Sequence, residues 1–358
     1  MNKKSILITT GIYPPEIGGP ATYTALVEGE LRSRGWNVEV LPFRTVRFLP
    51  KVVRHIAFAF LVMFRSFGKR YVYAQDVVSV GLPSILVSRI FFKKFIVRVP
   101  GDFAWEQGTQ RFGVKDTIDD FQNKKYDWKT EMFRSIQKFV VSHADMVVVP
   151  SDYFLDLVSR WGVEENRIKR IYNGVSVPEG LPETDIKEKI IVSAGRLVPW
   201  KGFDDLLKIL KDLGDYKLEI FGDGEDLKRL QGIARELSLY DRVSFMGQVD
   251  RKTLLSHIKS ASVFALASKF ESFSFQIVES MMVGTPVVAY DIGNLSEIVK
   301  NGENGFLVSD ISAFSEKIKF ISENKEERNV FSKKATLASL DFGLSNCVDT
   351  LEVSILNI

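Results

Sequence analysis

The residues of this chain that could do chemistry are concentrated in three loops. The loops are GIYPPEIGGP at 11–20, GRLVPWKG at 195–202 and ESFSFQIVE at 271–279. Each follows a short apolar run and precedes a helical pattern, so each is expected to join a β-strand to a helix. Backbone N–H groups at the start of a helix attract anions, and all three loops could therefore hold a phosphate or another oxyanion.

Two of these loops have the residue types that suit a diphosphate. The second carries Arg196 and Lys201, five residues apart, with a glycine at each end. An arginine binds phosphate through a two-pronged fork, whereas a lysine acts as a point charge. The first loop has Gly18 and Gly19 just before a predicted helix, where the missing side chains let the backbone approach a ligand. The alternatives are a solvated basic loop and a turn that merely needs glycines.

The third loop holds two carboxylates, Glu271 and Glu279, eight residues apart. A helix is predicted to open near Ser274 and to end at Gly284, with Pro286 beyond it. Carboxylates that face a pocket accept hydrogen bonds from sugar hydroxyls. The alternative is that both are ordinary acids near a helix start, where the macrodipole favours them.

The elements that position these loops alternate between strand and helix in two successive sets. The strand-like runs are 5–10, 38–41, 71–74, 95–99, 146–149 and 168–172, then 189–194, 217–221, 243–246, 263–266, 287–290 and 306–308. This alternation predicts an α/β protein of two open parallel-sheet domains packed face to face, with ligands at the carboxyl ends of the strands. The stretch 174–185, rich in proline and glycine, predicts the domain boundary.

The composition argues against a disordered, a fibrous or a membrane-embedded protein. The 358 residues, 45% hydrophobic and 26% charged, are ordinary for a globular chain of about two domains. One cysteine, Cys347, and three histidines argue against a cysteine-based zinc cluster or a His-rich metal site, and they indicate a reducing compartment. No signal peptide is visible. The longest apolar run, Ile56–Phe64, has nine residues, whereas a helix that crosses a bilayer needs about 20.

The net charge of +3 hides an uneven distribution. Residues 1–100 hold 15 Lys/Arg and 5 Asp/Glu, a balance of +10, which leaves 33 and 40 for residues 101–358, a balance of −7. The segment 49–70 reads LPKVVRHIAFAFLVMFRSFGKR, with an apolar centre between the cations Lys51, Arg54, Arg65, Lys69 and Arg70. This pattern is typical of an interfacial helix on anionic lipid. The alternative is a buried helix with cationic ends.

Taken in order, these motifs resemble the retaining, nucleotide-sugar-dependent glycosyltransferases of family 4, also called glycosyl transferases group 1, which have the GT-B fold. The segments that carry the resemblance are 11–23, 151–175, GRLVPWKG at 195–202, FGDGED at 221–226, VSFMGQV at 243–249, the two glutamates and 284–308. The resemblance covers most of the chain. It implies two Rossmann-like domains facing a central cleft: an acceptor-binding domain over 1–175 and a nucleotide-sugar donor domain over 176–340. A last helix over 341–358 would return to the first domain.

The resemblance also implies roles on the donor side. Arg196 and Lys201 would bind the donor diphosphate. Glu279 would bind the ribose hydroxyls, and Glu271 the hydroxyls of the transferred sugar. The loop 247–251 would flank the base. The sugar and phosphate would be held by the backbone of four successive residues, Ser272, Phe273, Ser274 and Phe275.

The first domain departs from the family pattern. Many family members carry His-Gly after the fourth strand, but this chain reads PGDFAWE at 100–106, with proline at the histidine position. Asp102 and Glu106 therefore become the candidates for handling the acceptor hydroxyl, and surface acids beside a turn are the alternative. Gly18 and Gly19 would close over the donor diphosphate.

The implied function is transfer of a hexose from a nucleotide diphosphate sugar to a glycan or polyprenyl-linked acceptor in cell-surface polysaccharide synthesis, such as that of lipopolysaccharide. We expect no cofactor beyond this co-substrate and no required metal, since no Asp-x-Asp triplet occurs. The expected location is cytoplasmic, peripheral on the inner face of the cell membrane.

Three alternatives remain open at the sequence level. The first is a nucleotide-sugar epimerase or hydrolase on the same double-domain fold. The second is an NAD-dependent oxidoreductase, although the only Gly-x-Gly after a strand, at 222–224, lacks its third glycine. The third is a non-catalytic nucleic-acid-binding protein that uses the basic N-terminal half. It would need the interleaved aromatic and basic residues of known modules, which are not recognisable, so we expect no nucleic-acid partner.

Overall fold

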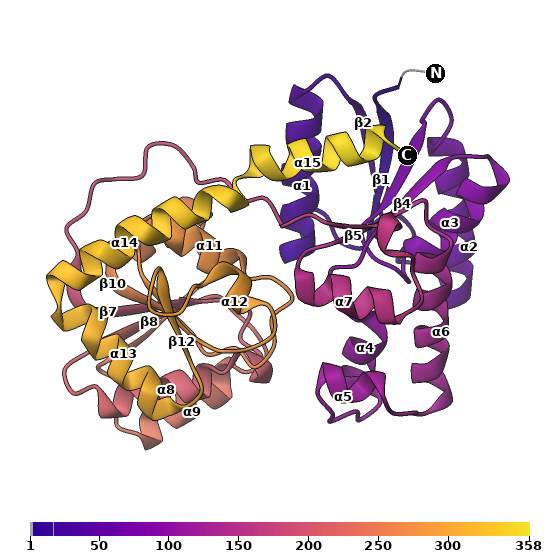
Figure 1. Ribbon diagram of the computed structural model, residues 1–358. Helices are drawn as coiled ribbons and strands as arrows, with labels where there is room; N and C mark the ends of the chain where they lie inside the picture. The colour runs from indigo at the N-terminus through magenta and orange to yellow at the C-terminus, as the bar shows by residue number, and fades with distance from the viewer. Residues whose placement is uncertain (1–2, 17) are drawn as a thin grey trace. The chain divides into compact units, whose positions relative to one another are not determined.

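The computed structural model describes residues 3–16 and 18–358, which form two compact units. The N-terminal unit runs to Gly174 and includes Leu344–Ile358, and the C-terminal unit is Val175–Gly343. The division between the units lies at the start of the stretch 174–185, where the composition indicated a boundary. The chain's last helix packs against the first helix of the N-terminal unit (Figure 1).

The N-terminal unit is built on a six-stranded parallel sheet with the order β2-β1-β3-β4-β5-β6. Its strands are β1 (Ser5–Thr10), β2 (Asn37–Pro42), β3 (Tyr71–Ala74), β4 (Lys94–Arg98), β5 (Met146–Val149) and β6 (Ile168–Arg170). Its helices are α1 (Gly19–Ser33), α2 (Lys51–Arg65), α3 (Gly81–Ile90), α4 (Phe103–Arg111), α5 (Ile118–Gln122), α6 (Trp128–Ser142), α7 (Asp152–Arg160) and α15 (Leu344–Leu356), with 3-10 turns η1 (Phe43–Val46) and η2 (Glu165–Arg167).

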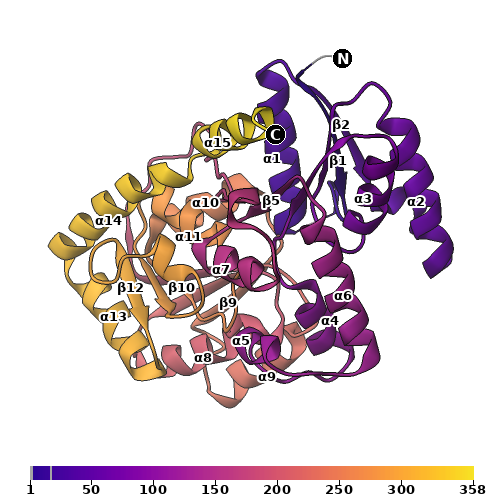
Figure 2. The ribbon, with the colours of Figure 1, turned by 45° about the vertical axis from the view of Figure 1, so that its right-hand side comes forward.

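Helices cover both faces of this sheet. Helix α1 lies on one side of the strands, and α2 and α3 lie together on the other (Figures 1 and 2). Every residue of β1, β3 and β5 is buried. These strands therefore read as short continuous apolar runs rather than alternating ones, as expected for parallel strands with two covered faces.

The C-terminal unit has a second six-stranded parallel sheet, with the order β12-β11-β10-β7-β8-β9. Its strands are β7 (Lys187–Ala194), β8 (Lys217–Phe221), β9 (Val243–Gly247), β10 (Ala261–Leu266), β11 (Val287–Tyr290) and β12 (Gly305–Val308). Its helices are α8 (Phe203–Asp212), α9 (Leu227–Glu236), α10 (Arg251–Ser260), α11 (Phe275–Met282), α12 (Leu295–Ile298), α13 (Ile311–Glu323) and α14 (Lys325–Ser339), with 3-10 turns η3 (Pro199–Lys201) and η4 (Leu340–Phe342).

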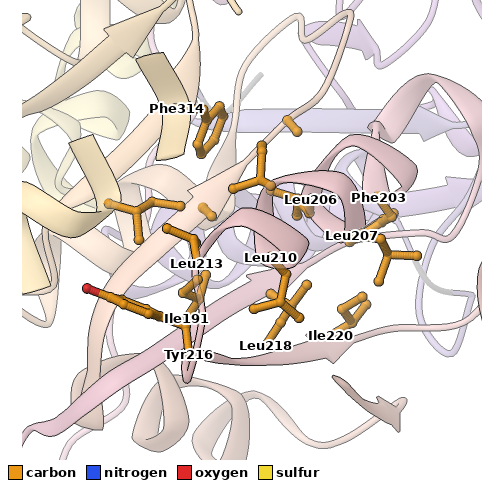
Figure 3. Close-up of a cluster of buried hydrophobic side chains, with 14 of the residues drawn as sticks. Ile191, Phe203, Leu206, Leu207, Leu210, Leu213, Tyr216, Leu218, Ile220 and Phe314 are labelled. Atoms are coloured by element: carbon orange, nitrogen blue, oxygen red, sulfur yellow. The ribbon is translucent and has the colours of Figure 1, made fainter. Parts of the chain in front are cut away.

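The core of the C-terminal unit shows why α8 forms where it does. The apolar residues of this helix recur at three- and four-residue spacing, so they share one face of the helix. That face packs against residues of β7, β8 and α13, and the cluster drawn in Figure 3 includes Phe203, Leu207, Leu210, Ile191 and Phe314. Burial of this face anchors α8 and, with it, the loop 195–202 that leads into the helix.

The predicted fold class is confirmed: the chain is an α/β protein of two Rossmann-like units. Each of the twelve predicted strands is present, with bounds shifted by at most two residues. The strand β10 starts at Ala261 rather than at Val263 because α10 passes into it without a loop, through the extended backbone of Ala261. The strand β6 ends at Arg170, where the side chains of this edge strand are exposed.

The strand order decides where loops can form a site. In the N-terminal sheet, the chain runs from β1 to β2 on one side and from β3 to β4 on the other, so the strand order reverses between β1 and β3. In the C-terminal sheet the order reverses between β7 and β10. Ligands of open parallel sheets bind outside the carboxyl ends of strands at such reversals. The loops after β1, β7 and β10 are the three that the residue types singled out.

None of the helices in the described part of the chain is long and apolar enough to cross a membrane.

Candidate functional site

Two of the predicted loops meet at the carboxyl edge of the C-terminal sheet. The backbone N–H of Lys269, just after β10, donates to the carbonyl oxygen of Trp200, in the loop after β7, at 2.8 Å. Gly202 has φ +66°, and a Cβ there would lie 1.9 Å from the carbonyl oxygen of Ala267. A side chain at this position would force the loops apart, so Gly202 is what lets 195–202 press against the chain leaving β10.

This close approach joins a cation of one loop to a carboxylate of the other. Lys201 Nζ lies 2.5 Å from Glu271 Oε1, and the side chains are only 17% and 8% exposed. A buried ion pair gives up hydration on both sides, so each partner is held mainly by the other. A ligand that offers an anionic oxygen to Lys201 and hydroxyl groups to Glu271 can satisfy both. The fold therefore brings together two residues that the sequence predicted separately as site residues.

Arg196, the second cation of the loop after β7, lies in a different environment. It is exposed, and its guanidinium carbon is 5.4 Å from the centre of the Trp200 ring. Stacking on an aromatic ring orients the guanidinium and leaves its N–H groups at the surface. The loop thus presents one partly buried cation, Lys201, and one exposed cation, Arg196.

The start of α11 forms as predicted. Ser274 is buried and caps the helix, with its hydroxyl accepting from the backbone N–H of Ile277 at 3.4 Å. The backbone before the cap is held on two sides: the Ser272 carbonyl oxygen accepts from Asn294 Nδ2 at 2.6 Å, and the Phe273 ring packs 5.5 Å from that of Phe275. The backbone of residues 272–275 is therefore preorganised at a helix N-terminus, where an anion is favoured.

The second glutamate lies inside α11 and has its own cation. Glu279 is 6% exposed, and Arg251 Nε donates to its Oε1 at 2.6 Å. Arg251 also donates to the carbonyl oxygen of Ser176. Burial raises the pKa of the Glu279 carboxyl, and the charge and hydrogen bond of Arg251 oppose this shift. Sequence reasoning placed Arg251 only in a loop beside the base; the partner 28 positions away could not be read from local pattern.

The glycines of the motif 221–226 support the site through packing. A Cβ at Gly222 would lie 2.0 Å from the Gly195 carbonyl oxygen, and a Cβ at Gly224 would lie 2.2 Å from that of Leu197. The loop after β8 therefore presses directly on the loop after β7. This packing explains both glycines without a bound dinucleotide.

In the N-terminal unit, the loop after β1 is held by cations of the basic stretch. Arg44 donates to the carbonyl oxygens of Tyr13 at 2.9 Å and Pro14 at 2.7 Å, and Arg47 donates to that of Gly11 at 3.0 Å. Part of the positive excess seen in the sequence thus has a structural role.

Gly18 and Gly19 stand at the start of α1. Gly18 is the N-cap, with φ +152°, and Gly19 is the first, exposed helical residue. A Cβ at Gly18 would lie 3.0 Å from Ile12 Cδ1. The structure therefore places both glycines at a helix N-terminus, as predicted, and gives Gly18 a backbone conformation that other residues rarely adopt. Their contact with a diphosphate stays a prediction.

Asp102 is more deeply buried than a surface acid. Its exposed fraction is 0%, and it caps α4 by accepting from the backbone N–H of Trp105 at 3.1 Å. It also accepts from Gln137 Nε2 at 3.0 Å and from Gln122 Nε2 at 2.8 Å. Neutral donors thus occupy both carboxylate oxygens. The alternative of a solvated acid beside a turn does not hold for Asp102, and its catalytic role stays a prediction.

Glu106 lies one turn further along α4 and is half-buried. A Cβ at Gly101 would lie 2.2 Å from Glu106 Oε1, so the glycine makes room for this carboxylate. Asp102 therefore caps the helix that carries Glu106, and the two predicted acceptor-side acids belong to one local structure.

Arg98, at the end of β4, is a residue that sequence reasoning missed. It is 3% exposed, its Nη2 donates to Asn173 Oδ1 at 2.6 Å, and its guanidinium carbon lies 3.9 Å from the centre of the Tyr23 ring. Its Nη1, like the side-chain amide of buried Gln75 after β3, finds no hydrogen-bond partner among residues 3–16 and 18–358. A lone arginine at a strand end carries no local signal, so only the fold could reveal this cluster.

A metal site was not expected from the sequence. Within the described ranges, no group of three or more His, Cys, Asp or Glu gathers that could hold a metal ion.

Comparison with known proteins places this site in a family context. Residues 182–338 match the family model described as Glycosyl transferases group 1. An uncharacterized glycosyltransferase of Haemophilus influenzae is 30% identical over 46% of this chain and 48% of the relative. The D-inositol 3-phosphate glycosyltransferase of Mycolicibacterium smegmatis is 30% identical over 60% of this chain and 53% of the relative. The chain thus spans about half the length of these curated relatives.

Solved structures share the fold over nearly the whole chain. The Anabaena protein HepE, crystallised with UDP and glucose, superposes with a TM-score of 0.78 at 18% identity, covering 99% of this chain and 100% of that one. The lipopolysaccharide outer core galactosyltransferase WaaB superposes with a TM-score of 0.72 at 20% identity, covering 99% of each chain. At these identities the likeness shows the fold.

Proposed function

We propose that this chain, whose residues 182–338 belong to the glycosyl transferases group 1 family and whose fold is GT-B, is a hexosyltransferase. It moves a hexose, with retention, from a nucleotide diphosphate sugar to a glycan or polyprenyl-linked glycan in cell-surface polysaccharide synthesis. The observation that carries the proposal is the Lys201–Glu271 pair, because it sets a partly buried, phosphate-binding cation beside a buried, hydroxyl-binding carboxylate at a strand-order reversal.

The donor roles follow from what each group can bind. Lys201 and the exposed Arg196 supply positive charge for the diphosphate. Glu271 accepts hydrogen bonds from the hydroxyls of the transferred sugar, and Glu279 accepts them from the ribose. The backbone N–H groups at the start of α11, over 272–275, stabilise the leaving phosphate. These cations and N–H groups can hold the diphosphate without a metal ion, so we expect turnover to survive a chelator.

The acceptor roles concern the N-terminal unit. Gly18 and Gly19 contact the donor diphosphate through their backbone N–H groups. Glu106, on the helix that Asp102 caps, handles the acceptor hydroxyl, and both oxygens of Asp102 accept hydrogen bonds within the unit. Asp102 keeps the helix start in place and, in the stronger form of the hypothesis, shares the handling of the acceptor hydroxyl.

The test is a thermal-shift screen of nucleotide sugars, beginning with UDP-glucose because the HepE structure holds UDP and glucose. A donor that binds only the folded protein at one hundred times its Kd adds about 2.7 kcal/mol of stability, which raises the melting temperature. Lys201→Ala is the matched control, and its shift should be much smaller. No shift with any nucleotide sugar, or an equal shift in the variant, contradicts the donor site.

A second measurement separates transfer from the other reactions of this fold. The rate of nucleotide release is measured with and without a glycan or lipid-linked acceptor. Release that rises with acceptor supports transfer. Release that is independent of acceptor supports the epimerase or hydrolase alternative. Salt-sensitive DNA or RNA binding without nucleotide-sugar affinity supports the nucleic-acid alternative.

A further inference from the structure

The N-terminal unit exposes a broad apolar surface on α2. Ile56, Phe60 and Phe64 recur along one side of the helix, and Phe67 continues the row beyond its end. Phe60, Phe64 and Phe67 are 56%, 63% and 69% exposed. The opposite side of α2 is also apolar and is buried in the unit, for example through Phe58. The buried-helix alternative therefore accounts for one side of α2 and leaves the other unexplained.

Helix α3 extends this surface. It lies beside α2 (Figures 1 and 2), and its Leu86 and Ile90 are exposed. Between the helices runs an open groove of about 320 Å³, lined by Ile56, Phe60, Met63, Leu86, Ile90 and Phe91, among other residues. A contiguous apolar patch of this kind is rare on a protein that meets only water, and it marks an interaction surface.

The turn after α3 ends in an unusual residue. Phe92 is 95% exposed and adopts φ +52°, in the left-handed region. The Lys93 N–H donates to the Ser88 carbonyl oxygen at 2.8 Å, which is the helix-ending arrangement that normally uses glycine. A bulky side chain is disfavoured there both by strain and by exposure to water. The end of α3 therefore does not explain why a phenylalanine, rather than a glycine, stands at position 92.

The positive charge around the apolar surface of α2 and α3 indicates an anionic partner. Residues 44–94 contain ten Lys/Arg and one acidic residue, a balance of +9. The single acid, Asp76, is occupied by the backbone N–H groups of residues 78–80. Two copies meeting through this surface would bring like charges together, whereas an anionic partner is attracted.

The structure also corrects which cations are available. Lys69 is buried and donates to Asn37 Oδ1 at 2.7 Å, and Arg65 pairs with Glu39 at 2.7 Å. Lys51 remains exposed at the start of α2. Around α3, Arg89 is exposed and donates to the carbonyl oxygen of His143. Lys93 donates to the carbonyl oxygen of Lys69 at 2.9 Å, and Lys94 pairs with Asp145 at 3.4 Å. Lys51 at the start of α2 and Arg89 near the end of α3 therefore supply exposed positive charge, one beside each helix.

We infer that the surface made by α2, α3 and the turn at Phe92, here called the docking face, binds an anionic lipid bilayer. Its phenylalanines enter the interface, the groove receives an acyl chain, and the bordering cations meet lipid phosphates. Aromatic and aliphatic residues bordered by cations are what such an interface requires. This inference stands independently of the proposed transfer reaction.

The test is co-sedimentation of the full chain with phosphatidylcholine vesicles, with and without phosphatidylglycerol. We expect binding only when the anionic lipid is present, and weaker binding as salt rises. Phe60→Ser with Phe64→Ser should weaken binding at least tenfold. Phe92→Gly should weaken it severalfold without lowering the melting temperature, because glycine adopts this φ freely. Leu337→Ser, at an exposed leucine of the C-terminal unit, is the matched control and should bind normally.

Three outcomes overturn the inference. They are no binding to anionic vesicles, binding that the phenylalanine variants leave unchanged, and a dimer that these variants dissociate, since a dimer would assign the docking face to a second copy. The variants should show the wild-type thermal shift with the nucleotide sugar. This control keeps a failure of docking distinct from a failure of the proposed donor site.

Discussion

Glu271 in the C-terminal unit and Asp102 in the N-terminal unit are both buried carboxylates near the carboxyl end of a parallel strand, but they are satisfied in opposite ways. Glu271 is held by a single charged side chain, Lys201. Asp102 accepts hydrogen bonds from one backbone N–H and two side-chain amides. The first arrangement can exchange its partner for a ligand. The second closes a helix end and has little capacity left.

This difference offers a way to sort buried acids into ligand-binding and structural ones. A charged pair that is largely withdrawn from water is weakly compensated, so a ligand that solvates both partners can be accommodated at small cost. A carboxylate that accepts from several fixed N–H groups is stabilised within the fold itself. Glu279, with one strong contact to Arg251, belongs with Glu271.

The largest effect on turnover is expected from breaking the Lys201–Glu271 pair. Lys201→Ala should lower donor turnover, measured as kcat/KM, at least tenfold, or about 1.4 kcal/mol in the barrier. The variant loses the phosphate-binding charge and leaves Glu271 without its cation. Near-normal turnover would refute the assignment.

A swapped pair provides the control for that variant. Lys201→Glu combined with Glu271→Lys retains opposite charges on the two loops but reverses the groups offered to the ligand. Its melting temperature should exceed that of Lys201→Ala, while its turnover stays low. Recovery of turnover in the swapped protein would show that the pair acts only through stability.

Glu279→Gln should also lower turnover at least tenfold, and its effect on stability should depend on pH. Burial raises the pKa of Glu279 above its ordinary value, against the opposing Arg251. The folded state therefore binds this proton more tightly than the unfolded state, and the contribution to stability falls as pH rises from the unfolded pKa through the folded one.

Denaturant unfolding across that window measures the pH effect of Glu279. The stability of the Gln variant relative to the wild type should rise with pH above the ordinary glutamate value of 4.5. A flat difference would contradict the assigned environment of this carboxyl, whereas unchanged turnover would contradict its role in donor binding.

Asp102 accepts its hydrogen bonds within the fold, so its substitution should affect stability more than turnover. Asp102→Ala should destabilise the fold by about 1 kcal/mol through loss of the α4 cap. Asp102→Asn keeps the capping oxygen but turns its amide nitrogen toward the donor Gln122 Nε2, so it should fold with some loss of stability. Glu106→Gln should slow transfer more than it weakens donor binding. Transfer rates, donor affinities and unfolding curves of the three variants test this sorting. A folded Asp102→Asn protein that cannot transfer would return the catalytic role to Asp102.

The smallest effect is expected at Glu352 on α15, whose carboxylate contacts two cations and one neutral indole N–H. Burial acts to raise its pKa, but hydrogen bonds from Lys4, Trp36 and Arg34 outweigh burial and hold the pKa below its ordinary value. The stability from these contacts is present above the unfolded pKa and is lost as pH falls through the folded pKa. Glu352→Gln should reduce stability near neutral pH by less than about 1 kcal/mol, because Lys4 is partly exposed.

The pH dependence checks this last case. Chemical unfolding of Glu352→Gln and wild type should converge at acidic pH. A difference that persists there would mean that packing of α15, rather than the charge of Glu352, is responsible.

Much of the site could be predicted because its signals are local. The cap at Ser274, the loop position of Lys201 and the glycines before α1 follow from backbone preferences that act over a few residues. The pairing of Arg251 with Glu279 and the environment of Arg98 were not predictable in this way, since their partners lie 28 and 75 residues away. Such contacts depend on which strands are neighbours.

The amphipathic segment 49–70 shows the same limit. Its apolar centre and basic ends were evident in the sequence, but which side of α2 faces water and which cations are already paired depends on packing. The exposed Phe60 and the buried Lys69 have the opposite of their usual environments. Helical periodicity cannot distinguish two apolar sides of one helix.

By itself, the sequence determined the two sets of alternating elements, the loops that carry chemistry and the residue types within them, because hydrophobic period and turn chemistry are properties of short segments. Only the tertiary structure decided that the loop of Lys201 touches the loop of Glu271, that Asp102 is enclosed by amide donors, and that an apolar side of α2 remains uncovered. The physical reason is that burial and charge pairing depend on strand order and helix packing, which join residues far apart in the chain.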